Sequence, residues 1–165
     1  MKELKSRTLL FLVLFCIWVL LSLPLSSQEL IVGGIVSLVT AMIPWRRTAL
    51  LSEVKVTPKS ILFSFAYVFV FLKALVLANL DVALRVLSPK LPGNSGIVRV
   101  KTKLTSRLGR LILANSITLT PGTITVETKD DEFYIHWIDI KGHGVEERTK
   151  SIVSGFEKYL EVLFG

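Results

Sequence analysis

The chain has 165 residues and a mass of 18.4 kDa, with 51% hydrophobic residues, 20% charged residues and a mean hydropathy of +0.58. This composition argues against a purely soluble protein, because so apolar a chain needs more charge to stay dispersed in water. The single cysteine excludes an internal disulfide, and the two histidines exclude a zinc site with three histidine ligands. Because nine of the 13 acidic residues follow position 100, the sequence predicts an apolar first half and a water-facing second half.

Two apolar stretches near the N-terminus predict a helical hairpin in the membrane, with helices at about residues 9–25 and 29–45. Basic residues precede the first stretch, as they do in a signal peptide. However, no small-residue cleavage pattern follows, and the second stretch begins within a few residues, which favours the hairpin. The apolar part of the second helix, 30–43, has 14 residues, fewer than the roughly 20 that span a bilayer. This helix must therefore extend to Trp45, lie in a thinned bilayer or pack against partner helices.

The second apolar helix also carries small residues at spacings of three and four. They are Gly33, Gly34, Ser37 and Ala41. Such spacing lets two helix backbones approach closely in lipid. Small residues are also common in membrane helices generally, so the pattern leaves both interpretations open.

A third apolar helix is predicted at about 60–87, long enough to cross a membrane but with Lys73 in its middle. Small and polar residues follow one face of this helix, interrupted only by Phe71, and we expect this face to contact protein. The residues are Ser60, Ser64, Tyr67, Ala74, Ala78, Asp81, Arg85 and Ser88. Lys73 and Asp81 are candidates for ion handling, because charged residues at membrane depth are commonly functional. We favour a structural alternative, in which Asp81 pairs with Arg85 and Lys73 extends its ammonium to the interface.

Basic residues predict that the N-terminal tail and the loop at 44–60 are cytoplasmic. The segment around and after the end of the third helix is also basic, with seven Lys or Arg residues against the single acid Asp81. Three full crossings cannot satisfy all of these preferences. Either the third helix does not cross and lies oblique or along the cytoplasmic face against partners, or the C-terminal half is translocated as a domain despite its charge. We favour the first, because Lys73 and Asp81 are easier to place near an interface, and we predict a multi-pass cell-membrane protein with a cytoplasmic C-terminal domain.

A linker at 89–96, rich in Pro and Gly, separates the membrane domain, 1–88, from a small α/β domain at 97–165. The predicted order in this domain is β-α-β-β-α. Its elements are a strand at 97–104, a helix at 106–116, strands at 124–128 and 133–140, and a helix at 146–164. A type II turn at Pro121-Gly122 is expected to join the first of these helices to the following strand.

The water-facing half contains no pattern typical of an enzyme. His136 lies within a predicted strand, and His143 lies between two glycines without a carboxylate or cysteine at a ligand spacing. The sequence contains neither the GxGxxG pattern nor the P-loop pattern, which are the usual phosphate-binding signatures. The net charge of +7 is concentrated beside the apolar segments, so anionic lipid headgroups explain it better than nucleic acid. We therefore expect membrane lipids as a partner, no nucleic acid, no catalytic residue, no metal and no cofactor.

The segment LANSITLTPGT, residues 113–123, resembles the E subunit of Mrp-type multisubunit sodium/proton antiporters. Further residues carry the resemblance over nearly the whole chain. They are Asn79, Arg85, Val86, Pro92, Gly96, Ile97, Val98, Tyr134, Ile135, His136, Ile138 and Asp139. The resemblance implies an accessory membrane subunit of a cation (sodium)/proton antiporter module that supports assembly and ion translocation. Its implied partners are large multi-helix antiporter-like subunits. The module is either a stand-alone antiporter or part of a membrane-bound hydrogenase-type respiratory complex, in which hydrogenase-type subunits are further partners.

The same resemblance implies a structural role for the segment, because the family motif is not catalytic. The residues concerned are Asn115, Ser116, Thr118, Thr120, Pro121, Gly122 and Thr123. Asn, Ser and Thr side chains bond free backbone groups at a helix end, and Pro-Gly fixes a turn. The chain itself is then no enzyme, although its parent complex can be an oxidoreductase. The alternative function is a membrane-anchored scaffold or assembly factor with no transport role.

Overall fold

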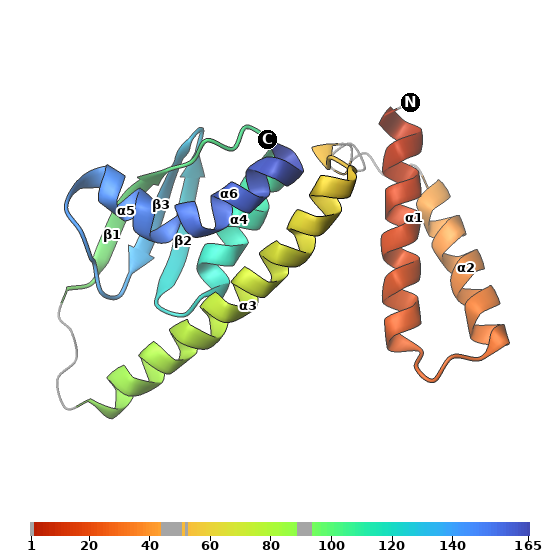
Figure 1. The fold of residues 1–165 in the computed structure, drawn as a ribbon, viewed down its shortest axis with the longest axis horizontal. Coiled ribbons are helices and arrows are strands. Elements are labelled where there is room, and N and C mark those ends of the chain that lie inside the picture. The colour runs from red at the N-terminus through yellow and green to blue at the C-terminus, as the bar shows by residue number, and fades with distance from the viewer. Residues whose placement is uncertain (1, 44–50, 52, 89–93) are drawn as a thin grey trace. The chain divides into compact units, whose positions relative to one another are not determined.

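The computed structural model describes the chain except for residues 1, 44–50, 52 and 89–93 (Figure 1). It contains two compact units, Met1–Val54 and Lys55–Gly165. The boundary falls before the third apolar helix. This helix therefore belongs structurally with the α/β elements, although the sequence groups it by composition with the first two apolar helices.

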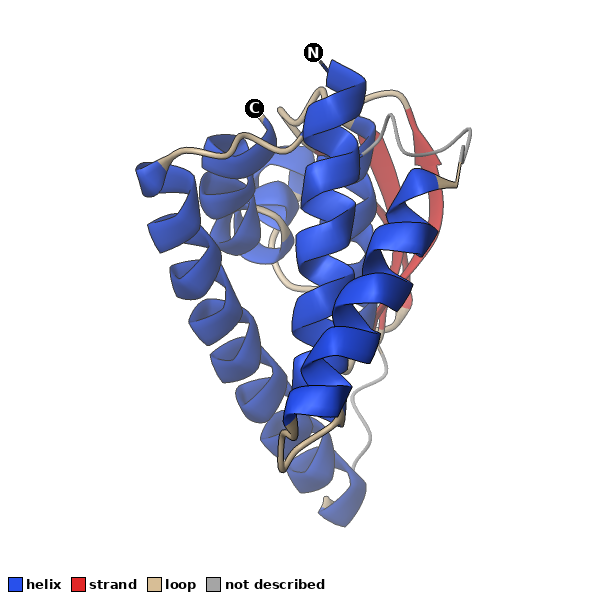
Figure 2. Ribbon diagram, turned by 90° about the vertical axis from the view of Figure 1, so that its right-hand side faces the viewer, coloured by secondary structure: helices blue, strands red, loops and turns tan. Residues whose placement is uncertain are grey.

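The first unit consists of α1 (Lys2–Leu21) and α2 (Ser27–Met42), which run side by side in both ribbon views (Figures 1 and 2). A capping box starts α2. The Ser26 hydroxyl accepts a hydrogen bond from the Glu29 N–H at 3.2 Å, and the Glu29 carboxylate accepts one from the Ser26 N–H at 2.8 Å. The Trp18 indole N–H donates to the Glu29 carbonyl at 3.0 Å and so ties the end of α1 to the start of α2.

Both helix ranges differ from those expected, because α1 starts within the basic tail and α2 ends at Met42. The close-packing interpretation of the small residues holds for the face of α2 on which Gly33, Ser37 and Ala41 are buried. A Cβ on Gly33 would lie 2.2 Å from Cδ1 of Trp18, so only glycine fits there. Gly34 is different, since a Cβ there would meet nothing within 4 Å.

The second unit begins with α3 (Pro58–Leu87), a helix of 30 residues. The Thr57 hydroxyl caps its start by accepting a hydrogen bond from the Ser60 N–H at 3.1 Å, and Pro58 occupies the first turn, where its missing N–H is harmless. The helix packs along α6 (Ser154–Phe164), as Figure 1 shows.

A three-stranded antiparallel sheet forms the rest of the unit together with three helices. The strands β1 (Gly96–Lys101), β2 (Thr123–Lys129) and β3 (Glu132–Trp137) lie in the order β1-β3-β2. Helix α4 (Arg107–Leu119) packs along β2, and α5 (Gly144–Ile152) packs along β1. The sheet and helices share one apolar core, whose fully buried members are Val98, Val100, Leu113, Ile117, Phe133, Ile135, Val153 and Leu160.

Two strands end earlier than predicted, because long-range bonds redirect the chain. Strand β1 stops at Lys101 instead of residue 104, since the Thr102 hydroxyl and the Lys103 N–H both bond the buried Glu157 carboxylate of α6. Strand β3 stops at Trp137 instead of residue 140, and the next N–H, that of Ile138, donates to the Gly122 carbonyl.

The last predicted helix is two helices, α5 and α6, which meet at Val153. The break buries the Val153 side chain completely, so the element order ends in two helices instead of one. Helix α4 runs to Leu119, three residues beyond the predicted end, and therefore contains the first half of the LANSITLTPGT segment.

Candidate functional site

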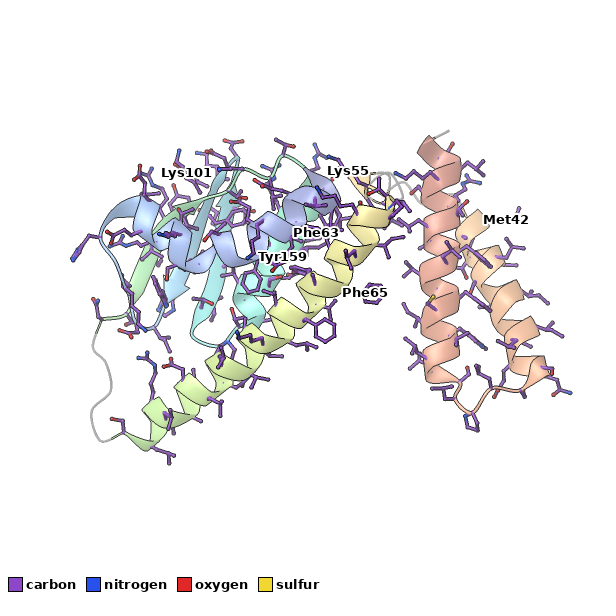
Figure 3. The ribbon with its side chains drawn as sticks, viewed as in Figure 1. Met42, Lys55, Phe63, Phe65, Lys101 and Tyr159 are labelled. Carbon is purple, nitrogen blue, oxygen red and sulfur yellow. The ribbon has the colours of Figure 1, made fainter. Side chains whose placement is uncertain are left out.

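The small and polar face of α3 contacts the α/β elements, and aromatic rings hold its first half. The ring centroids of Phe63 and Tyr159 lie 6.0 Å apart, and those of Tyr67 and Phe71 each lie 6.5 Å from that of Phe156. Figure 3 shows Phe63 and Tyr159 pointing toward each other. Such ring pairs contribute about 0.5–1.5 kcal/mol each beyond their burial. Phe71, which interrupts the polar pattern in the sequence, thus takes part in the contact.

A hydroxyl pair links α3 to the end of α4. The Tyr67 hydroxyl hydrogen-bonds Ser116 Oγ, and the buried Ser116 hydroxyl also bonds the Ile112 carbonyl at 2.7 Å. Because Ser116 has one proton and gives it to that carbonyl, Tyr67 is the donor in the pair. The contact joins the polar face of α3 to the LANSITLTPGT segment, a link that the sequence does not reveal.

Hydroxyl groups of the LANSITLTPGT segment satisfy the carbonyls at the end of α4. Thr120 donates to the carbonyls of Ser116 at 3.1 Å and Ile117 at 2.8 Å, and Thr123 donates to that of Ile117 at 2.6 Å. The last carbonyls of a helix lack partners within the helix, so these bonds close it off. The structural role expected for these residues stays a prediction.

The remaining residues of the segment connect α4 to the sheet. Thr118 Oγ1 accepts a hydrogen bond from the Thr125 N–H at 3.1 Å. This bond gives a partner to one backbone N–H of β2, which is an edge strand of the sheet. Gly122 has φ +96°, a conformation that side chains with a Cβ rarely adopt, and it lies against Ile138. Asn115 is exposed and lines a cavity of about 200 Å³ between α3 and α4.

The middle of α3 leaves a larger cavity, of about 320 Å³, against the α/β elements. Ala74 and Ala78 form part of its wall on α3. Pro121 of the turn, Trp137 at the end of β3 and Gly155 of α6 form part of the opposite wall. The LANSITLTPGT segment thus borders the cavity as well as closing α4.

An arginine anchors the last turns of α3. Arg85 Nε lies 2.6 Å from Asp81 Oδ2, and Arg85 Nη2 lies 2.8 Å from Asp139 Oδ2. One guanidinium therefore binds a carboxylate of its own helix and one that follows β3, with charge-assisted hydrogen bonds. The sequence analysis did not predict Asp139 as a site residue. The signal that could have indicated it was its place among the residues that carry the family resemblance.

Lys73 is exposed and forms no hydrogen bond or ion pair within the described part of the chain. It is eight residues from Asp81, about 12 Å along the helix axis. The structure therefore does not bring together the two residues that were candidates for an ion relay.

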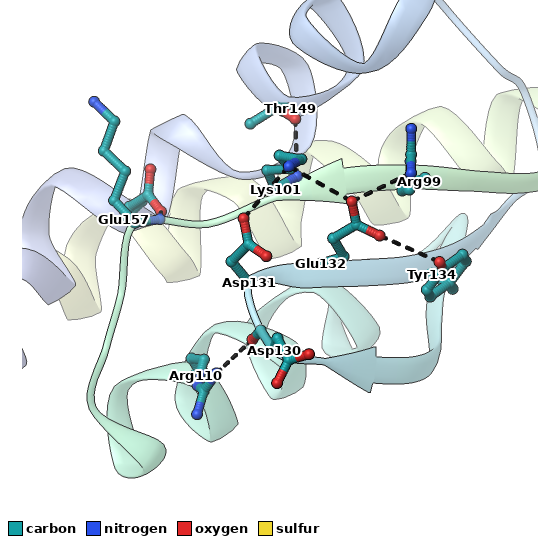
Figure 4. A network of polar contacts seen from close by, with 10 residues as sticks. Arg99, Lys101, Arg110, Asp130, Asp131, Glu132, Tyr134, Thr149 and Glu157 are labelled. Carbon is teal, nitrogen blue, oxygen red and sulfur yellow. Dashed lines mark hydrogen bonds and ion pairs between the residues drawn. The ribbon is translucent and has the colours of Figure 1, made fainter.

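Charged side chains at one end of the sheet pair with one another (Figure 4). Glu132 Oε1 lies 3.2 Å from Arg99 Nη1 and 3.6 Å from Lys101 Nζ, and its other oxygen accepts a hydrogen bond from the Tyr134 hydroxyl at 3.2 Å. Lys101 also lies 3.5 Å from Asp131. These mutual pairs join β1 to the hairpin of β2 and β3, and such exposed pairs contribute little stability each.

One of the two histidines lies in a strand and the other in the loop before a helix. His136 is half-buried in β3, and the exposed His143 precedes α5, where its backbone N–H donates to the Glu147 carboxylate at 2.8 Å. Among the residues that the structure describes, no group of three His, Cys, Asp or Glu side chains could hold a metal ion.

Within the part of the chain that the structure describes, two helices are long and apolar enough to cross a membrane, Glu3–Leu21 and Pro58–Leu87, and α2 is a shorter apolar helix. Much of their surface is uncovered. Phe65, for example, is 64% exposed and points away from the α/β elements in Figure 3. Helices of this kind joined to a small antiparallel sheet define a membrane-type subunit.

Comparison with known proteins identifies the family. The profile of the family described as "Na+/H+ ion antiporter subunit" matches residues 11–162, and the chain belongs to this family. The Na(+)/H(+) antiporter E subunit of Alkalihalophilus pseudofirmus is 43% identical over 90 residues, 53% of this chain and 56% of that protein. The corresponding Na(+)/H(+) antiporter protein of Bacillus subtilis is 42% identical over 95 residues, 56% of this chain and 59% of that protein. The chain thus matches just over half the length of these relatives.

A solved structure matches over almost the full length. It is a chain of the membrane-bound sulfane sulfur reductase (MBS), an archaeal respiratory membrane complex. The two chains are 45% identical with a TM-score of 0.83, and the match covers 96% of this chain and 98% of that one.

Proposed function

We propose that this chain is an accessory subunit of a sodium/proton antiporter module, and that the module is part of a respiratory membrane complex. The match to a chain of such a complex over 96% of this sequence carries the proposal. The relatives named as antiporter E subunits support the module, and the archaeal complex supports its setting. Large multi-helix antiporter-like subunits are then its principal partners, with oxidoreductase subunits, hydrogenase-type among the candidates, in the same assembly.

The role that we propose is assembly rather than chemistry. The polar groups described above are engaged in closing helices, joining strands and anchoring α3. Arg85, for instance, is bound by two carboxylates. Among the described residues, Lys73 forms no ion pair with an acidic side chain, and a lone charge is a poor path for protons or sodium ions. The ion route therefore belongs to the larger subunits, and this chain needs no cofactor.

In this proposal, α1 and α2 cross the membrane as a hairpin, and α3 lies on its cytoplasmic face. The contacts from Phe63 to Arg85 cover 23 residues, whose 22 steps extend about 33 Å along the helix, as long as the roughly 30 Å hydrocarbon core. If α3 crossed, the polar domain packed along it would have to enter the bilayer. The basic residues around the linker support the same orientation. Residues 1–88 then contact the membrane, 89–96 connect, and 97–165 form a cytoplasmic domain.

Affinity purification tests the proposal. The full-length chain, tagged after Gly165, is recovered from membranes in mild detergent, and the co-purifying proteins are identified by mass spectrometry. We expect large antiporter subunits together with oxidoreductase subunits. Antiporter subunits alone would indicate a stand-alone antiporter. Recovery with a lone soluble protein would contradict the proposal and favour the membrane-anchored scaffold.

A further inference from the structure

We propose that the 320 Å³ cavity beside α3 binds an acyl chain of a phospholipid whose phosphate pairs with Lys73. The inference rests on the proposed function in one respect, the location of α3 at the membrane surface. The inference assigns a phospholipid as the ligand of a cavity that the proposed assembly role does not explain.

Most of the cavity wall is apolar. Val70, Ile152 and Phe156 contribute hydrocarbon, and the hydroxyls of Thr120 and Thr123 are already bonded to carbonyls at the end of α4. The exposed Ser151 adds one hydroxyl, and no charged side chain lines the cavity among the residues that the structure describes. A strongly polar ligand would therefore replace few of the hydrogen bonds that it makes with water.

The gap is held open from both ends. Aromatic rings fix the first half of α3 against α6, and Arg85 fixes its last turns through Asp139. Between these anchors, α3 contributes the small side chains of Ala74 and Ala78 to the cavity wall. A Cβ on Gly155 of that wall would meet nothing within 4 Å. The contact therefore cannot easily collapse, and its volume is within the roughly 300–1,000 Å³ of ordinary ligand sites.

An acyl chain is the occupant that this location favours. Leu72, Val76 and Leu77 lie on the same turns of α3 as the cavity wall, and all three are exposed and apolar. In a membrane subunit these residues contact lipid hydrocarbon, which is thus present beside the cavity at high concentration.

Lys73 supplies the charge that a phospholipid needs. It directly precedes Ala74 of the cavity wall, is exposed, and forms no ion pair within the described ranges. Its apolar stem can lie along α3 while the ammonium reaches a headgroup phosphate. The one charge in the apolar middle of α3 is then explained without an ion path.

Fluorescence quenching tests the inference, because Trp137 lines the cavity. The full-length chain with Trp18 and Trp45 changed to Phe is reconstituted into vesicles of phosphatidylcholine brominated near the middle of its acyl chains. We expect quenching of Trp137. Ala78→Leu, which fills the cavity, should abolish this quenching, whereas Ala83→Leu makes the same change at an exposed position of α3 and should preserve it.

A protein that retains Trp18 as its sole tryptophan is the positive control, since Trp18 lies on the apolar α1. Quenching of Trp18 but not of Trp137 would overturn the inference, and so would quenching of Trp137 that Ala78→Leu leaves unchanged. Gly155→Leu fills the cavity from the other wall and replaces Ala78→Leu if that variant misfolds. These outcomes leave the co-purification result unaffected, so failure of the lipid site and failure of the proposed function are distinguishable.

Retention of lipid after detergent extraction tests the headgroup contact. Native mass spectrometry of the purified chain counts phospholipid bound per molecule. We expect retained phospholipid in the parent and in Ala83→Leu, and loss in Ala78→Leu and Lys73→Gln. Equal retention in all four proteins would contradict both the cavity and the role of Lys73.

Discussion

Gly122→Ala is expected to destabilise the α/β part of the chain by about 1–3 kcal/mol. Gly122 has φ +96°, and a residue with a Cβ is disfavoured in a left-handed conformation by roughly 1–2 kcal/mol. The added Cβ would also lie 3.2 Å from Cδ1 and 3.3 Å from Cγ1 of Ile138, so that side chain must shift. Because the turn joins α4 to β2, the change should also lower the yield of assembled complex.

Two other glycines separate the effect of the backbone conformation from the effect of the contact with Ile138. Gly144 has φ +79°, but a Cβ there would meet nothing within 4 Å, so Gly144→Ala introduces backbone strain alone. Gly155 lies in α6 with free space around it, so Gly155→Ala should be neutral or stabilising, since alanine is favoured over glycine in a helix by about 1 kcal/mol. The expected order of loss is Gly122→Ala, then Gly144→Ala, then Gly155→Ala.

Thermal unfolding of the full-length chain in detergent, followed through Trp137 fluorescence with Trp18 and Trp45 changed to Phe, measures these effects. A loss of 1 kcal/mol lowers the midpoint by roughly 4–8 °C in a small domain. If Gly122→Ala unfolded at the same temperature as Gly155→Ala, the reasoning from turn geometry would be refuted. Normal complex yield with lost transport would contradict a structural role for the segment.

Three further predictions concern topology and charge. A tag after Gly165 should be reached by an impermeant label only after cells are opened, and labelling from outside intact cells would overturn the surface location of α3. Lys73→Met should leave sodium-dependent proton movement near normal in vesicles that contain equal amounts of complex, whereas complete loss would place Lys73 on an ion path. Arg85→Met should lower unfolding stability, as measured by thermal unfolding, because it leaves Asp139 without its main partner. Asp81→Asn should change it by less than about 1 kcal/mol, since the Asp81 side chain is 57% exposed, and equal losses in these two variants would argue against the anchor.

Sequence patterns predict the helices and strands whose ends are set by residues close to them in the chain. The third helix was expected at 60–87 and is found at Pro58–Leu87, because the Thr57 cap and the apolar run both act within a few residues. The break at Val153 and the early end of β1 depend instead on burial and on Glu157, which lies 55 residues from Thr102. No local pattern contains such information.

The contacts of the candidate site likewise divide into local ones, which the sequence can indicate, and long-range ones, which it cannot. Thr120 and Thr123 bond carbonyls within six residues, so these hydrogen bonds could be inferred from spacing and turn chemistry. The ion pair of Arg85 with Asp139 joins residues 54 apart, and the cavity depends on the distance between α3 and α6. A stripe of small residues on α3 indicated a contact face, but not that two of its alanines would leave space.

The most direct test of the central claim is to measure the antiporter module with and without this chain. Membranes are prepared from cells that make the remaining subunits, and both the amount of assembled module and sodium-dependent proton movement are determined. We predict that the two quantities fall together when the chain is absent and recover together when it is restored. A module that assembles and transports normally without the chain would contradict the account.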